Sequence, residues 1–179
     1  MRLLLDANVI YPSVMREMLL QVAHEGLFEP RWSPRILEEW ARAAARLGPV
    51  EQAQARGEIA VMTANWPRAS VPPKDGDMAR LWLPDPDDIH VLASAIAASA
   101  DGIVTMNSKD FPKHILAEEG LQRYEPDGLL YALWLDHPAM IAAAAERTRL
   151  KAERMSDEPR ETAPLIKKAR LPRLAKALR

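Results

Sequence analysis

Apolar runs that end in acidic residues occur at two places in the chain. Residues 1–5 are almost entirely apolar and precede Asp6, and the β-branched run 103–105 precedes Asn107 and Asp110. Short runs of this kind predict buried strands of a parallel sheet. Because ligands bind at the carboxyl ends of such strands, the pattern predicts that both strand ends contribute to one site.

Apolar residues at helical spacing follow two capping signatures. The segments 33–47 and 85–97 both begin with an N-cap residue and a proline, SP in the first and DP in the second. This pairing is typical of a helix start. Helical geometry places Glu39 at the edge of the first apolar stripe and Asp88 about 60° from the centre of the second. A carboxylate so close to a core needs a partner that offsets its burial.

The rest of the pattern predicts further helices and weaker strands. Helices are expected at residues 13–25, 50–62, 112–119, 128–136 and 137–155 and in a last basic segment, and weaker strands at 27–32, 69–71 and 121–124. Residues 63–84, rich in proline, are expected to form a long connection. This order predicts a three-layer α/β/α fold with a central, mostly parallel sheet over residues 1–125, and a helical C-terminal extension over residues 126–179.

Four acidic residues share a place at the edge of the predicted core. They are Asp6, Glu39, Asp88 and Asp110. Two like charges about 4 Å apart repel by about 4 kcal/mol at an effective dielectric constant of about 20. Four converging carboxylates therefore need a cation or strongly raised pKa values. Oxygen ligands suit Mg²⁺ or Mn²⁺ better than Zn²⁺. Such an ion activates water and stabilises a phosphoryl transition state, which predicts a phosphodiester or phosphoester substrate.

Four segments of the chain resemble the motifs of PIN-domain nucleases, which include the VapC-like toxins of bacterial toxin–antitoxin pairs. They are LLLDANVI (3–10), SPRILEEW (33–40), DPDDIHVLASA (85–95) and IVTMNSKDF (103–111). The segments occur in the family's order, and the resemblance spans about residues 1–125. It implies a PIN-like fold and a Mg²⁺- or Mn²⁺-dependent endoribonuclease, commonly a homodimer and often silenced by a small antitoxin.

The resemblance also assigns roles to individual side chains. It implies that Asp6, Glu39, Asp88 and Asp110 are catalytic, and that all of these except Glu39 bind the metal. Helical geometry selects the same acid of the two adjacent acids in each helix, from different premises. Five residues are expected to support these acids or contact the substrate: Asn8, Asp85, Thr105, Asn107 and Ser108.

Charge is distributed unevenly along the chain, although the net charge is only −1. Residues 146–179 carry more Lys and Arg than Asp and Glu, and the remainder is acidic. The tail is either a solvated face or an electrostatic surface for RNA or a partner. Its candidate contacts are Lys167, Lys168, Arg170 and Arg173. No apolar run approaches the roughly 20 residues needed to cross a bilayer. The absence of cysteine is compatible with the reducing cytoplasm, so we expect a cytoplasmic protein.

Structural explanations exist for each acid taken singly. Asp6 could end a strand in a turn, Glu39 could be surface charge, and the other acids could cap helices. The histidines show no ligand spacing, and His90 is expected to point away from the apolar face, so a catalytic histidine is not expected.

Two other functions remain open at this level. A phosphatase of the haloacid-dehalogenase type also needs an aspartate after its first strand. It needs a second aspartate where Asn8 stands, and a lysine for which Lys109 is a weak candidate. The other alternative is a non-catalytic module that binds nucleic acid or a partner through its basic tail while its acids are structural.

Overall fold

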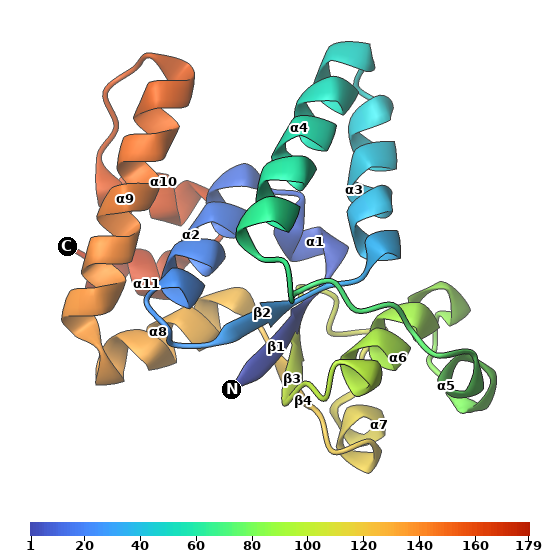
Figure 1. Ribbon diagram of the computed structural model, residues 1–179. Helices are drawn as coiled ribbons and strands as arrows, with labels where there is room; N and C mark the ends of the chain where they lie inside the picture. The colour runs from blue at the N-terminus through green and yellow to red at the C-terminus, as the bar shows by residue number, and fades with distance from the viewer. The chain divides into compact units, whose positions relative to one another are not determined.

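A computed structural model describes residues 1–179 and contains four strands and twelve helical segments (Figure 1). The strands are β1 (Arg2–Leu5), β2 (Glu29–Arg31), β3 (Gly102–Val104) and β4 (Gln122–Tyr124). The helices are α1 (Ala7–Ile10), α2 (Ser13–His24), α3 (Pro34–Ala45), α4 (Pro49–Asn65), α5 (Asp75–Arg80), the 3₁₀ turn η1 (Pro86–Asp88), α6 (Ile89–Ala97), α7 (Lys113–Glu118), α8 (Pro126–Asp136), α9 (Pro138–Ser156), α10 (Thr162–Lys168) and α11 (Pro172–Ala177). The chain forms two compact units, residues 1–8 with 29–123, and residues 9–28 with 124–179.

The four strands form one sheet in the order β2-β1-β3-β4. β1 pairs in parallel with β2 on one side and with β3 on the other, and Leu4 lies opposite both Arg31 and Ile103. Leu3, Leu4 and Leu5 are fully buried, as expected for a central strand. The predicted α/β class with a mostly parallel sheet and a helical C-terminal part is therefore confirmed.

The strand order also indicates where a ligand would bind. The chain leaves β1 toward β2 on one side and later returns to β3 on the other, so the direction of winding reverses between β1 and β3. In open α/β sheets the crevice beyond the carboxyl ends of such a strand pair holds the ligand. The residues that follow these two strands begin with Asp6 and Thr105.

Two capped helix starts precede or contain Glu39, Asp85 and Asp88. The hydroxyl of Ser33 accepts a hydrogen bond from the backbone N–H of Ile36 at 3.1 Å and caps α3, which packs along α4. Asp85 caps the 3₁₀ turn η1, because its Oδ1 accepts from the N–H of Asp87 at 2.9 Å. Both caps agree with the sequence prediction. Helix α6 then packs against β1 and β3 and carries the end of η1 to the sheet.

The predicted orientation of His90 is wrong. Its side chain is only 1% exposed, and every residue from His90 to Ala95 is buried. The prediction assumed a helix with one buried face, whereas the core surrounds the first two turns of α6. A polar side chain in that position needs a partner, which is Glu39, as described below.

Three further segments differ from the sequence prediction. Residues 75–80 form helix α5 within the predicted connection, with Asp75 and Asp77 in its first turn and Arg80 in its last, an arrangement that the helix dipole favours. The strand expected at 69–71 is reduced to a single bridge between Trp32 and Ser70. The last basic helix is divided into α10 and α11, because Arg170 adopts a left-handed conformation with φ of 64°.

The second unit is built from α2 and the helices α8 to α11. Helix α2 packs against α9, and Met18 and Ile141 are fully buried in its core. Part of the basic tail is paired within this unit: Lys151 contacts Glu17, and Arg147 contacts Glu25. Of the tail cations singled out in the sequence, Arg173 lies 4.6 Å from the centre of the Tyr131 ring. The side chains of Lys167, Lys168 and Arg170 are exposed. No helix of the structure has the length and apolar character of a membrane span.

Candidate active site

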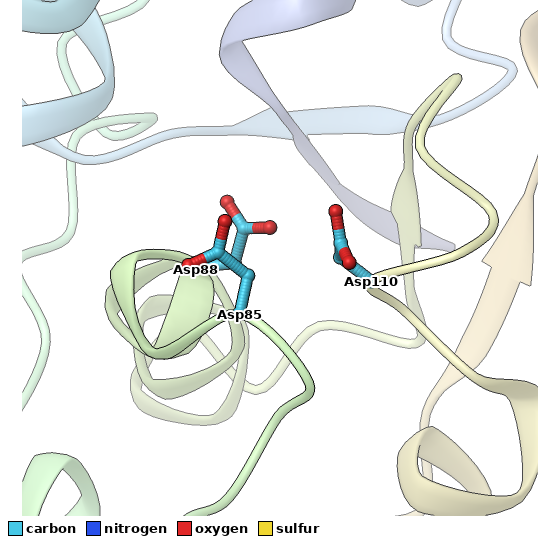
Figure 2. A group of neighbouring side chains, drawn as sticks. All are labelled: Asp85, Asp88 and Asp110. Carbon is cyan, nitrogen blue, oxygen red and sulfur yellow. The ribbon is translucent and has the colours of Figure 1, made fainter.

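Three aspartates meet at the carboxyl end of the sheet (Figure 2). One carboxylate oxygen from each of Asp85, Asp88 and Asp110 lies within 4.8 Å of the other two. Asp85 and Asp88 come from the turn that opens α6, and Asp110 faces them from the loop that follows β3. Two segments more than a dozen residues apart in sequence thus present carboxylates to one space.

Asp85 is itself a member of this acidic group, in addition to its role as a cap. Sequence reasoning placed it among the supporting residues, because an Asp–Pro pair is explained by a helix cap. In a 3₁₀ turn, however, side chains three residues apart lie above one another, so Asp85 and Asp88 project to the same side. The carboxylate of Asp85 therefore caps η1 and also belongs to the acidic group. The sequence D-P-D-D predicts that Asp85 and Asp88 lie on the same side only if this turn is a 3₁₀ turn.

Asp6 is held by a dense set of hydrogen bonds at the end of β1. Its side chain is 5% exposed. Its Oδ1 accepts from the N–H of Ala7 at 2.7 Å. Its Oδ2 accepts from the amide of Asn8 and the hydroxyl of Thr105, both at 2.8 Å. Burial raises the pKa of Asp6, and the hydrogen bonds from Thr105 and Ala7 partly oppose that rise. Asp6 is not one of the three clustered aspartates, but its charge acts on Asp88.

Asparagine and threonine side chains connect the loop after β1 with the loop after β3. Asn8 also accepts from the N–H of Met106 at 3.1 Å. Thr105 accepts from the N–H of Asn107 at 3.0 Å. The amide of Asn107 in turn donates to Asp110 at 2.9 Å and to Asp88 at 3.4 Å. Asn8 and Thr105 therefore donate hydrogen bonds to Asp6, and Asn107 donates to Asp110 and Asp88. The exposed side chain of Ser108 takes no part in these bonds.

Arg123 fixes the loop that carries Asp110 without neutralising the acids. Its Nη1 donates to the carbonyl oxygens of Ser108 at 2.8 Å and Phe111 at 2.9 Å. The guanidinium thus binds backbone on both sides of Asp110. Nothing in the motif pattern indicated this role, because Arg123 lies outside the resembling segments.

Glu39 differs from its neighbour Glu38 in its partners, not in its exposure. Their side chains are 37% and 38% exposed. Glu38 pairs with Arg42 and Arg56 on the surface. Glu39 instead contacts the buried His90, with 2.8 Å between Oε1 and Nε2. The charge of Glu39 contributes to the raised pKa of Asp6, so this carboxylate lies close enough to act on Asp6.

The pKa of Asp88 is raised by several neighbouring negative charges. It is raised to about 6, first by partial burial and then by the charges of Asp6, Asp85 and Asp110. The hydrogen bonds that these carboxylates accept, described above, come from neutral donors. The acids therefore repel one another, and no Lys or Arg side chain pairs with them.

This donor set fits a hard divalent cation. All the candidate ligands are carboxylate oxygens, which Mg²⁺ and Mn²⁺ prefer. Ligands on opposite sides of a Mg²⁺ ion are about 4 Å apart, and the three oxygens already lie within 4.8 Å of one another. Binding would require only a small inward shift of the side chains and would relieve the repulsion that raises the pKa of Asp88.

The sequence profile of the family described as PIN domain matches residues 2–109. The chain belongs to the PIN-domain family. The matched range contains Asp6, Glu39 and Asp88 and ends one residue before Asp110. No curated protein and no solved structure gives a match. PIN domains are generally metal-dependent nucleases, and the cluster of three aspartates agrees with that activity.

Removing the hydroxyl of Thr105 is expected to destabilise this PIN domain, because the buried Asp6 loses a hydrogen-bond donor. Thr105→Val keeps the shape of the side chain but deprives Asp6 of a donor and Asn107 N–H of its acceptor. We expect a loss of about 1–3 kcal/mol in the free energy of unfolding. The pKa of Asp6 should rise further, since the Thr105 hydrogen bond lowers it.

Chemical denaturation at pH 7.5 measures the loss, with Thr148→Val as the matched control. Thr148 is equally buried, but its hydroxyl donates to the carbonyl of Ala144 within its own helix, away from any acid. Equal losses in both variants, with unchanged Mn²⁺ affinity in Thr105→Val, would contradict a specific role for Thr105.

Proposed function

We propose that this PIN domain is an endoribonuclease that hydrolyses RNA phosphodiester bonds with the help of Mg²⁺ or Mn²⁺. The observation that carries the proposal is the meeting of Asp85, Asp88 and Asp110, with Asp6 buried beside them, at the winding reversal of the sheet. A divalent ion held there would supply an activated water and positive charge for the phosphoryl oxygens.

The side chains at this site have two proposed roles, which are to hold the ion and to orient the carboxylates that hold it. Asp85, Asp88 and Asp110 are the residues that would hold the ion. Asn107 keeps the Asp110 and Asp88 carboxylates oriented through its amide hydrogens. The contacts of Glu39 with Arg35 and His90 both involve Oε1, so its Oε2 is available to accept a hydrogen bond from a water molecule.

The phosphatase alternative loses support at its second position. That chemistry requires a carboxylic acid two residues after the first aspartate, and Asn8 stands there. Asn8 uses its amide to donate to Asp6 and Thr105 and its oxygen to accept from Met106. An amide in these three contacts supports Asp6 and cannot act as a general acid.

The family and the charge pattern support a proposal about the partners of this protein and its place in the cell. We propose that RNA is the natural substrate, that the protein acts in the cytoplasm as a homodimer, and that a small antitoxin restrains it if it is a toxin. The exposed cations Lys167, Lys168 and Arg170 are the proposed contacts for RNA or for such a partner.

A cleavage assay with chemical readout tests the proposed reaction. Purified protein is incubated with single-stranded RNA, structured RNA, the matching DNA and a small phosphate monoester, in Mn²⁺ or in EDTA. We expect cleavage of RNA only with the ion. In H₂¹⁸O the label should enter the product phosphate, without a 2′,3′-cyclic phosphate, because the nucleophile is water. Ion-independent cleavage, cyclic phosphate products, or turnover of the monoester alone would contradict the proposal.

A further inference from the structure

His90 is a buried polar residue that none of the roles above explains. It lies in the first turn of α6, with Ile89 and Val91 on either side, and its side chain is 1% exposed. An imidazole in such surroundings is normally retained with its hydrogen bonds satisfied. Only one of its two ring nitrogens has a partner here, since Nδ1 makes no hydrogen bond.

The single partner of His90 is the carboxylate of Glu39. Nε2 lies 2.8 Å from Oε1. An ionised carboxylate only accepts hydrogen bonds, so the hydrogen of a neutral His90 belongs on Nε2. The hydrogen on Nε2 is therefore donated to Glu39, while Nδ1 makes no hydrogen bond.

The other contact of Glu39 is weaker. Arg35 reaches the same oxygen, Oε1, at 3.5 Å, and its side chain is 51% exposed. Exposed ion pairs within one helix contribute only about 0.3–0.5 kcal/mol. A hydrogen bond from a rigid, buried ring restricts the carboxylate far more than a long solvated side chain does. Both contacts involve Oε1 and leave Oε2 for other ligands.

We propose that His90 is a positioning residue that holds the Glu39 carboxylate beside Asp6 and the aspartate cluster, with Oε2 directed to the ion or its water. This inference rests on the proposed metal-dependent function and deepens it. Two observations support the placement. Helix α6 carries His90 two residues after Asp88, and the charge of Glu39 acts on Asp6. Groups that orient metal-site carboxylates commonly change metal affinity by 10–100-fold when removed.

A double-mutant cycle on Mn²⁺ affinity tests the proposal without relying on catalysis. Calorimetry on the full chain with Mn²⁺ alone compares the wild type with His90→Leu, Glu39→Ala and the double variant. We expect His90→Leu to weaken binding by about tenfold and to have no further effect in the Glu39→Ala background. His90→Gln, which keeps a donor at similar reach, should restore affinity to within about threefold of the wild type.

Ser94→Ala is the matched control on the same helix. Ser94 is fully buried, and its hydroxyl has no partner. Its removal changes a buried polar group in α6 without touching Glu39, so Mn²⁺ affinity should stay unchanged. An equal loss from His90→Leu in both backgrounds, or no loss in the wild-type background, would overturn the positioning role.

A spectroscopic readout covers the case in which His90→Leu fails to fold. In ¹⁵N spectra of the metal-free wild type, His90 should be the tautomer protonated at Nε2, and Glu39→Ala should shift that signal. A ring protonated at Nδ1, or a signal indifferent to Glu39→Ala, would overturn the proposal. Absence of RNA cleavage by the wild type would instead contradict the proposed function, because the binding cycle reads ion affinity alone.

Discussion

Asp88→Asn is expected to reduce Mn²⁺-dependent RNA cleavage by at least about 10³-fold, equivalent to about 4 kcal/mol of activation free energy. Asp88 is the acid on which the charges of Asp6, Asp85 and Asp110 converge, so it is the side chain for which a bound cation matters most. The amide removes the negative charge and one of the clustered oxygens while keeping the size of the side chain. Single-turnover cleavage of a labelled RNA at saturating Mn²⁺ measures the loss.

Asp87→Asn is the matched control for this experiment. Asp87 is the adjacent acid in the same 3₁₀ turn, and it is exposed and stands outside the aspartate cluster. It contributes its backbone N–H to the cap, which the substitution retains. Its cleavage rate should stay within about twofold of the wild type, because the substitution removes no clustered carboxylate and a surface change of this kind alters stability by only about 0.5 kcal/mol or less. Equal losses in the two variants would show that charge near the turn, rather than the cluster, supports activity.

Asp88→Asn is also expected to stabilise the metal-free protein at neutral pH. The pKa of Asp88 is raised from 3.8 to about 6 in the folded state. A raised carboxyl pKa means that the folded state binds this proton more tightly than the unfolded chain does. The stability that the folded state gains from this tighter proton binding is therefore fully present below about pH 4 and is lost as the pH rises through about 6. Above pH 7 Asp88 is ionised in the folded protein and is repelled by the charges of Asp6, Asp85 and Asp110.

The expected size of this effect is moderate. A shift of this magnitude corresponds to about 3 kcal/mol, and solvent screening of the half-buried carboxylate reduces it to about 1–2 kcal/mol. In EDTA at pH 8, Asp88→Asn should melt a few degrees above the wild type, and the difference should vanish near pH 4. Saturating Mn²⁺ should reverse the order at pH 8 by stabilising the wild type alone, by about 2.7 kcal/mol at 100 times Kd. A variant that is less stable than the wild type in EDTA at every pH would contradict the repulsion.

Local signals were sufficient to predict the parts of the fold that depend on short stretches of sequence. The central strand, the Ser33 cap and the Asp85 cap each depend on residues within a few positions of one another. The positions of Asp6 and Thr105 at two strand ends follow from the rule for parallel sheets. The strand rule does not place Asp85 and Asp88, because they come from the turn before α6 and not from a strand end.

The features that sequence did not reveal depend on partners distant in the chain. His90 is buried because Glu39, on a different helix, satisfies one of its nitrogens. Arg123 holds the Asp110 loop from strand β4, through carbonyl groups that carry no sequence signal. The position of Asp85 depends on the tighter winding of a 3₁₀ turn, which a helical wheel drawn at about 100° per residue does not represent.

The predicted boundary between residues 1–125 and 126–179 stays a prediction. Residues 9–28 group with the C-terminal helices, so the two compact units are not consecutive segments of the chain. A pattern read along the sequence has no means of assigning α2 to helices more than a hundred residues away. The pairs Lys151–Glu17 and Arg147–Glu25 join them within the second unit.

Anomalous diffraction from crystals grown with Mn²⁺ tests the central claim most directly, because it locates the ion without reference to activity. We predict a peak in contact with the carboxylates of Asp85, Asp88 and Asp110, with Mn–O distances near those of other hard cations, about 2.0–2.4 Å. A peak bound by other residues, or none at these aspartates when Mn²⁺ is saturating, would contradict the account.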